Sequence, residues 1–134
     1  MAAAAPVAVG LLALSLGLGV PAAAWFWPRP ATNIAEAAAL GDAARMRALA
    51  AQGAAVDAAL PVRPGLLDGS PPAMSALDAA IRRGDYAVVE VALELWDRPA
   101  RQEVVRLYCA AAGSSREIAE RLRMRFDLGL GVCR

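Results

Sequence analysis

The sequence predicts an all-α fold, a short stack of three antiparallel helix pairs preceded by a hydrophobic helix at the N-terminus. Three observations lead to this prediction. The chain is rich in alanine, which favours helix, and only 5% of its residues are aromatic. Glycine–aspartate pairs at 41–42 and 84–85 each separate two short periodic apolar segments, as expected for corners between helices. The β-branched residues are too scattered to predict strands.

Residues 2–27 carry no charged side chain, and a helix of this length spans a bilayer. We therefore expect residues 1–28 to form an uncleaved membrane anchor, with the aromatic residues at 25–27 in the water interface. Two alternatives stay open. One is a signal segment cleaved before Trp25, which would follow three alanines but lacks a basic N-terminal region. The other is a buried helix.

The orientation of this segment depends on opposing signals. Arg29 follows the apolar stretch and favours a cytoplasmic domain, whereas the short uncharged N-terminal tail favours export. We expect an exported domain, periplasmic or extracytoplasmic, that stays tethered to the membrane. Residues 29–31 then form a short linker, and residues 32–134 form one small domain.

The first helix pair is predicted from its caps. Asn33 is a typical N-cap and Glu36 stands three residues later, which is the pattern of a capping box before a helix over 34–40. Gly41-Asp42 ends that helix. A second helix over about 43–52 carries Met46 and Leu49 inward, and a glycine at 53 ends it.

The second pair follows a long irregular segment. Residues 54–73 contain four prolines, two glycines and two aspartates, so we expect a loop without regular structure. Ser75 caps the next helix, and Asp78 favours its N-terminus. Gly84-Asp85 is the second corner, and the helix after it ends near Trp96. The predicted inward positions of this pair are Leu77, Ala80, Ile81, Val88, Val89, Ala92 and Leu93.

The third pair is predicted as a longer helix and a final one. Asp97 is expected to cap a helix that starts at Arg98-Pro99 and ends at Gly113, and Ser114 with Glu117 forms the next capping box. Glycines at 129 and 131 end the last helix. The predicted apolar faces are Val104, Val105, Tyr108, Ala111 and Ala112 on the first helix, and Ile118, Ala119, Leu122 and Phe126 on the second.

Alignment of Gly41 with Gly84 reveals an internal repeat. The stretches "SALDAAIRRG" at 75–84, "VVEVAL" at 88–93 and "GAAVDA" at 53–58 resemble the ankyrin-repeat pattern of T-P-L-H-x-A-A-x-x-G, V-V-x-x-L-L and G-A-D-x-N. Ser75, Ala76, Leu77 and Asp78 stand where that family has Thr, Pro, Leu and His. The resemblance implies a short ankyrin-like α-solenoid with repeats at about 32–57 and 74–97 and a degenerate cap at 98–131.

The departures from this pattern are clear. The two glycines lie 43 residues apart, whereas an ankyrin repeat has about 33, and the extra residues fall in the long loop. The histidine of the family motif is absent, and Trp96-Asp97 replace the final turn of the second unit. The third pair matches the pattern only in "AAAG" at 110–113 and in its helical layout.

As an ankyrin-like adaptor, the chain is expected to be a non-enzymatic module that binds an unknown protein through loop tips and first helices. The expected contact residues are Arg63, Leu66, Leu67, Asp68, Arg82 and Arg83. For Leu66 and Leu67, packing back onto the domain is the other interpretation. Membrane contact would come from residues 2–27.

Two other functions stay open. Residues 30–97 hold 5 arginines and 9 acids, whereas residues 98–134 hold 8 arginines and 4 acids, so copies of the chain could join head to tail. The asymmetry equally fits local ion pairs on a solvated surface. A small helical enzyme or ligand carrier is the third function.

The residue inventory predicts no catalytic residue, no metal site and no cofactor. The chain has no histidine, and no serine or carboxylate pair suggests a nucleophile with its base. Cys109 and Cys133 are too few and too far apart for a zinc site, and the net charge of +1 argues against nucleic-acid binding. Cys109 is expected to be a buried free thiol, with a Cys109–Cys133 disulfide as the alternative in an exported domain.

Overall fold

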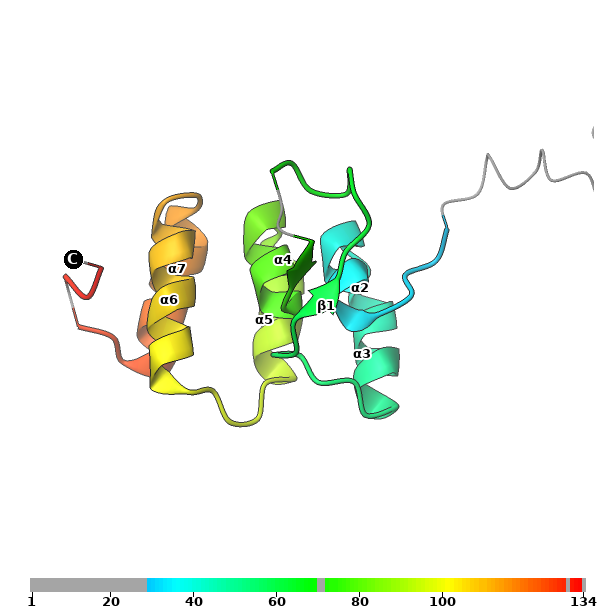
Figure 1. Ribbon diagram of the computed structural model, residues 1–134. Helices are drawn as coiled ribbons and strands as arrows, with labels where there is room; N and C mark the ends of the chain where they lie inside the picture. The colour runs from blue at the N-terminus through cyan, green and yellow to red at the C-terminus, as the bar shows by residue number, and fades with distance from the viewer. Residues whose placement is uncertain (1–28, 70–71, 130, 134) are drawn as a thin grey trace, which may run out of the picture. The chain divides into compact units, whose positions relative to one another are not determined.

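The computed structural model describes residues 29–69, 72–129 and 131–133, which are mostly helical (Figure 1). Residues 31–134 form a unit of their own, separate from the segment before it, and the description below concerns that unit. The predicted N-terminal helix, anchor or signal segment at 1–28 lies outside the described residues. Within the described ranges, no helix is both long and apolar enough to cross a bilayer.

Six α-helices and one two-stranded sheet are present in the described part of the chain. The elements in chain order are α2 (Ile34–Leu40), α3 (Ala43–Ala51), β1 (Leu60–Pro61), β2 (Ala73–Met74), α4 (Ala76–Arg83), α5 (Tyr86–Glu94), α6 (Arg101–Ala112) and α7 (Arg116–Phe126). The predicted all-α class is therefore correct at the level of a mostly helical fold.

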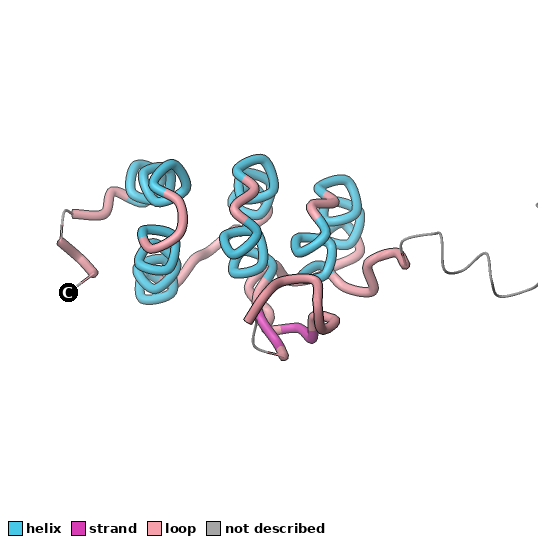
Figure 2. The backbone as a smooth tube through the Cα atoms, turned by 90° about the horizontal axis from the view of Figure 1, so that it is seen from above, coloured by secondary structure: helices cyan, strands magenta, loops and turns pink. Residues whose placement is uncertain are grey.

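The helices pack as three consecutive pairs, α2 with α3, α4 with α5, and α6 with α7. Helix α4 contacts α2 on one side and α6 on the other, and α5 contacts both α3 and α7. The first helices of the pairs thus form one layer and the second helices form another, as Figure 2 shows. The core between the layers is built from alanines and medium-sized aliphatic residues, which allow close helix approach.

The first two pairs follow the predicted cap chemistry. The side chains of Asn33 and Ser75 accept hydrogen bonds from the backbone N–H groups of Glu36 and Asp78. Both corner glycines are left-handed, with φ of 79° at Gly41 and 73° at Gly84. The aspartate after each glycine caps the next helix. These caps depend only on residues that are close in sequence, so the sequence predicted these four helices correctly.

Three of the four helix boundaries predicted in the third pair are wrong, and the end at Gly113 is correct. Helix α6 starts at Arg101, its N-cap is Ala100, and no side chain caps it. The proline at 99 disfavours helical backbone at the residue before it, so the helix begins after the proline and not at Arg98. Helix α7 is capped by Ser115, while the hydroxyl of Ser114 donates to carbonyls at the end of α6. Helix α7 ends at Phe126 with Asp127 as its C-cap, before the glycines at 129 and 131.

The buried face of α6 also differs from the prediction. Val104, Leu107 and Ala111 are buried, whereas Val105 and Tyr108 are half-buried and Ala112 is exposed. On α7, Ile118, Ala119 and Leu122 are buried as predicted, and Phe126 is half-buried against Trp96. The ring centroids of Trp96 and Phe126 lie 6.2 Å apart in an edge-on arrangement.

The long segment between α3 and α4 contains a feature that the sequence did not predict. Strands β1 and β2 pair antiparallel, with Leu60 opposite Met74 and Pro61 opposite Ala73. The expectation of a loop without strands was wrong because two residue pairs give no detectable period. The segment lies along the layer of first helices, where β1 contacts α2 (Figures 1 and 2).

Candidate functional site

A buried carboxylate holds the long segment against α2. Glu36 is only 2% exposed. One of its oxygens accepts hydrogen bonds from the backbone N–H and hydroxyl of Thr32, at 2.9 and 2.8 Å. The other accepts from the backbone N–H and Nε of Arg63, at 3.2 and 2.9 Å. Beside it, the amide of Asn33 donates to the carbonyl of Pro61 at 2.8 Å. We call these contacts the Glu36 clamp.

The clamp keeps Glu36 ionised. Burial of the carboxyl raises its pKa, but the hydrogen bonds from Thr32 and Arg63 outweigh that effect, so the pKa lies below its ordinary value. The predicted capping box is therefore only half correct. Asn33 caps the helix as expected, whereas Glu36 binds Thr32 and the long segment and not the N–H of Asn33.

A shallow groove lies between the sheet segment, the start of α4 and the start of α6. We call it the α4–α6 groove. Its polar lining side chains come from three parts of the chain that are distant in sequence. The groove is lined by Asp57, Ala59, Ala73, Met74, Ser75, Asp78, Arg82, Glu103 and Arg106.

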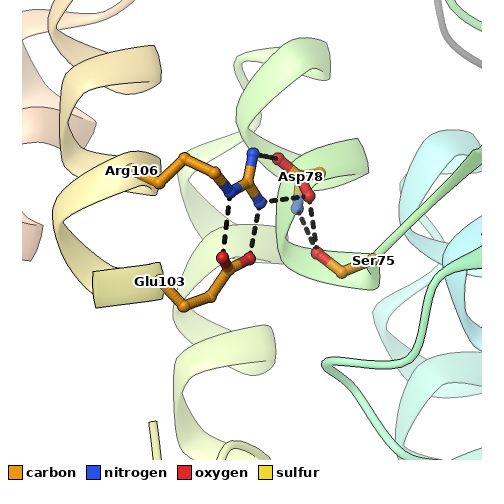
Figure 3. A network of polar contacts seen from close by, with 4 residues as sticks. All are labelled: Ser75, Asp78, Glu103 and Arg106. Atoms are coloured by element: carbon orange, nitrogen blue, oxygen red, sulfur yellow. Dashed lines mark hydrogen bonds and ion pairs between the residues drawn. The ribbon is translucent and has the colours of Figure 1, made fainter. Parts of the chain in front are cut away.

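One guanidinium organises this groove (Figure 3). Arg106 donates to both carboxylate oxygens of Asp78, at 3.0 and 2.6 Å, and to both oxygens of Glu103, at 2.9 and 2.6 Å. The hydroxyl of Ser75 donates to Asp78 at 3.0 Å and accepts from its backbone N–H. The N-cap of α4 is therefore linked through Asp78 to α6.

The paired carboxylates raise the pKa of Arg106 above its ordinary value, with Glu103 as the largest cause and Asp78 next. Burial opposes this shift. The guanidinium is thus a fixed positive charge between two helices. Asp57 and Arg82 remain as exposed charges at the edge of the groove, one of each sign.

A second ion pair joins the other layer. Arg121 on α7 donates to both oxygens of Glu90 on α5, at 2.6 and 2.7 Å. The hydrogen bond from Arg121 is the largest cause that lowers the pKa of Glu90, while burial opposes it. In both layers an acid of the second pair meets an arginine of the third. Local ion pairs therefore account for part of the acidic and basic halves of the sequence.

The six predicted contact residues do not form one cluster. Arg63 belongs to the Glu36 clamp, and Leu66 and Leu67 are half-buried against the core. Arg83 donates to the carbonyl of Ala39 at 2.9 Å and lies 3.6 Å from Asp85, so it links α4 to α2. Asp68 and Arg82 are exposed. Of the six, only Arg82 lines the α4–α6 groove.

Sequence reasoning missed the central residues of this groove. Asp78 was interpreted only as a helix-terminus charge, and Glu103 and Arg106 were not singled out. Their three-residue spacing on a helix is a usable signal for an ion pair. The contact between Arg106 and Asp78 joins residues 28 apart and depends on tertiary packing, so no local pattern indicates it.

The two cysteines form a disulfide. The expectation of a buried free thiol at Cys109 was wrong, because Cys109 is half-buried and bonded to Cys133, and the alternative is the one present. The bond ties the segment after α7 to the middle of α6. In ranges 29–69, 72–129 and 131–133 there is no group of three or more His, Cys, Asp or Glu side chains that could hold a metal ion.

Comparison of the chain with known protein families, curated proteins and solved structures finds no match in any of the three.

Proposed function

We propose that this chain is a non-enzymatic protein–protein interaction module, similar to ankyrin-repeat adaptors, that residues 2–27 tether to a membrane. The observation that carries the proposal is the equivalence of the first two helix pairs. Each has a capped first helix, a left-handed glycine, an aspartate cap and a second helix, and the pairs pack side by side. Stacked units of this kind present a continuous surface to a partner.

The proposed docking surface is the α4–α6 groove with Arg82 at its edge. The groove lies on the layer of first helices, and its internal charges are already paired through Arg106. A partner therefore meets a rigid surface on which Arg82 and Asp57 are exposed charges. Such a site suits an extended polar segment of another protein, because rigid charged groups at a rim select partners by complementary charge.

An extracytoplasmic location fits the same proposal. Disulfides form and persist in oxidising compartments and are rare in the reducing cytosol. The Cys109–Cys133 bond therefore supports an exported domain. A membrane tether would confine the module and its partner to one surface, which raises their effective concentration.

The proposal is tested by site-specific crosslinking in the source cell. A photoreactive residue that replaces Ala59 at the rim of the groove should capture a discrete partner protein. Arg82→Glu should abolish that capture and remove the partner from pull-downs. Arg116 is the control position, because it is also exposed but lies on α7 in the other layer. Equal capture from positions 59 and 116, or an unchanged pull-down with Arg82→Glu, would contradict the groove as the docking surface.

A further inference from the structure

The third helix pair is the least embedded part of the unit. Helix α4 contacts α6 less extensively than it contacts α2, and α7 contacts α5 least of all these packed neighbours. Helix α6 also lacks a side-chain N-cap. The polar links of the third pair to the second are Asp78–Arg106 and Glu90–Arg121, in which the arginine side chains are 49% and 38% exposed and the acids are more buried. Because solvent and salt reach both arginines, these pairs are partly screened.

The segment after α7 folds back and is held there by a covalent bond. Asp127 adopts a left-handed conformation with φ of 49°, and the N–H of Leu128 donates to the carbonyl of Arg123. The chain therefore reverses, and Leu128 becomes buried at 3% exposure. Five residues later Cys133 joins Cys109 of α6. The closed loop contains the last four residues of α6, Cys109–Ala112, and all of α7.

The disulfide is open to chemical attack. Cys133 is exposed and Cys109 is half-buried. Thiol–disulfide exchange requires that an attacking thiolate reach one of the two sulfurs. A dithiol reductant supplies two electrons and two protons, becomes a disulfide itself, and leaves Cys109 and Cys133 as thiols.

We propose that this disulfide is a redox control of the α4–α6 groove. Helix α6 supplies two of the polar residues that line the groove, Glu103 and Arg106. In the oxidised chain, the crosslink lies within the third pair. It lowers the chain entropy that α6 and α7 gain on local unfolding, so it keeps α6 folded beside α4. Reduction removes the restriction, the third pair opens more often, and the groove loses one wall. The proposal rests on the proposed function, since it concerns the same docking surface.

The first test measures opening of the third pair without any partner. Hydrogen exchange of the full chain is compared before and after treatment with dithiothreitol, with thiol alkylation to confirm reduction. Amides of Ala119–Leu122 in α7 should exchange roughly a hundredfold faster after reduction, because a crosslink over a loop of this size removes comparable chain entropy. Amides of Leu77–Ile81 in α4 should not change. The double variant Cys109→Ser/Cys133→Ser should match the reduced chain without reductant.

The second test measures the groove. Crosslinking from position 59 should fall to the level of position 116 when the disulfide is reduced or replaced by serines. Unchanged exchange in α7, or resistance of the native disulfide to dithiothreitol, would overturn the proposal. Faster exchange with undiminished crosslinking would also overturn it, because the bond would then not control the groove. If Arg82→Glu leaves capture intact in the oxidised chain, the docking site itself is rejected, and the exchange result still stands as a separate measurement.

Discussion

At the residue scale, the two corner glycines are equivalent in conformation but not in surroundings. Both have positive φ, so a side chain at either position is strained. A Cβ atom at Gly84 would meet nothing within 4 Å, whereas one at Gly41 would lie 2.8 Å from Nε of Arg83. That arginine also donates to the carbonyl of Ala39. The two units are therefore joined by a contact between Arg83 and Ala39 that the alignment of the two glycines does not reveal.

Because the two glycines differ in their surroundings, replacing each with alanine should lower the stability by different amounts. Gly84→Ala should lower the free energy of unfolding by about 1 kcal/mol, which is the conformational cost alone. Gly41→Ala should lower it by about 2 kcal/mol, because Arg83 must also leave its carbonyl partner. Urea denaturation of both variants measures this. Equal losses would show that Arg83 moves aside without cost.

The buried carboxylate at position 36 leads to a second prediction. Glu36→Gln removes the charge that pairs with Arg63 and turns one acceptor into a donor that faces other donors. We expect a loss of about 3 kcal/mol in the free energy of unfolding. Glu120→Gln is the control, because Glu120 is an exposed partner of Arg123 and its replacement should cost far less stability. Similar losses for both variants would mean that the Glu36 clamp is not a major stabilising contact.

The same carboxylate, together with Glu90, predicts how stability depends on pH. Both pKa values lie below the ordinary 4.5. As pH falls past that value, the unfolded chain therefore takes up these protons before the folded one does. Stability is fully present above about pH 5.5 and is lost as pH falls through the lower pKa values of the folded state. The chain has no histidine, so stability should be flat from there to neutral pH. Urea midpoints across this pH range measure the effect, and Glu36→Gln should show a shallower acid slope.

At the element scale, the start of α6 offers a stabilising substitution. Ala100 has the extended backbone of an N-cap, with φ of −68° and ψ of 131°, but no side-chain acceptor. At present the backbone N–H of Glu103 donates to the carbonyl of Ala100. Ala100→Ser adds a side-chain acceptor for the first turn and should raise the free energy of unfolding by about 1 kcal/mol. Ala110→Ser, at an exposed position inside the same helix, should instead lower it by a few tenths of a kcal/mol. A gain at both positions would point to a general effect of serine and not to capping.

The elements also show what a sequence can and cannot predict here. Caps at Asn33, Ser75 and the two glycines depend on neighbouring residues only, so these helices were predicted correctly. Ser114 and Ser115 are both good caps, and only the end of α6 decides between them. On α6, Leu107 is buried while Val105 is half-buried, because packing against α4 and α7 fixes the rotation of the helix. The Glu36 clamp and the α4–α6 groove join residues 27 and 28 apart, which no local pattern reveals.

At the scale of the whole molecule, the charge asymmetry of the sequence has an internal explanation. The acidic part supplies Asp78 and Glu90, and the basic part supplies their partners Arg106 and Arg121. Charges that are paired within one molecule are less available to join copies head to tail. This internal pairing favours a module that binds another protein over one that assembles with itself.

A charge exchange between α5 and α7 tests this explanation. Glu90→Arg alone places two cations together and should lower the free energy of unfolding, whereas the added Arg121→Glu should restore most of it. If the pairing is internal, sedimentation velocity should show the same monomer for the original and doubly exchanged chains at low and high salt. If copies join head to tail through opposite charges, the original chain should instead sediment faster at low salt than at high salt. The double exchange leaves net charge unchanged, so any difference in association must come from where the charges lie and not from how many there are.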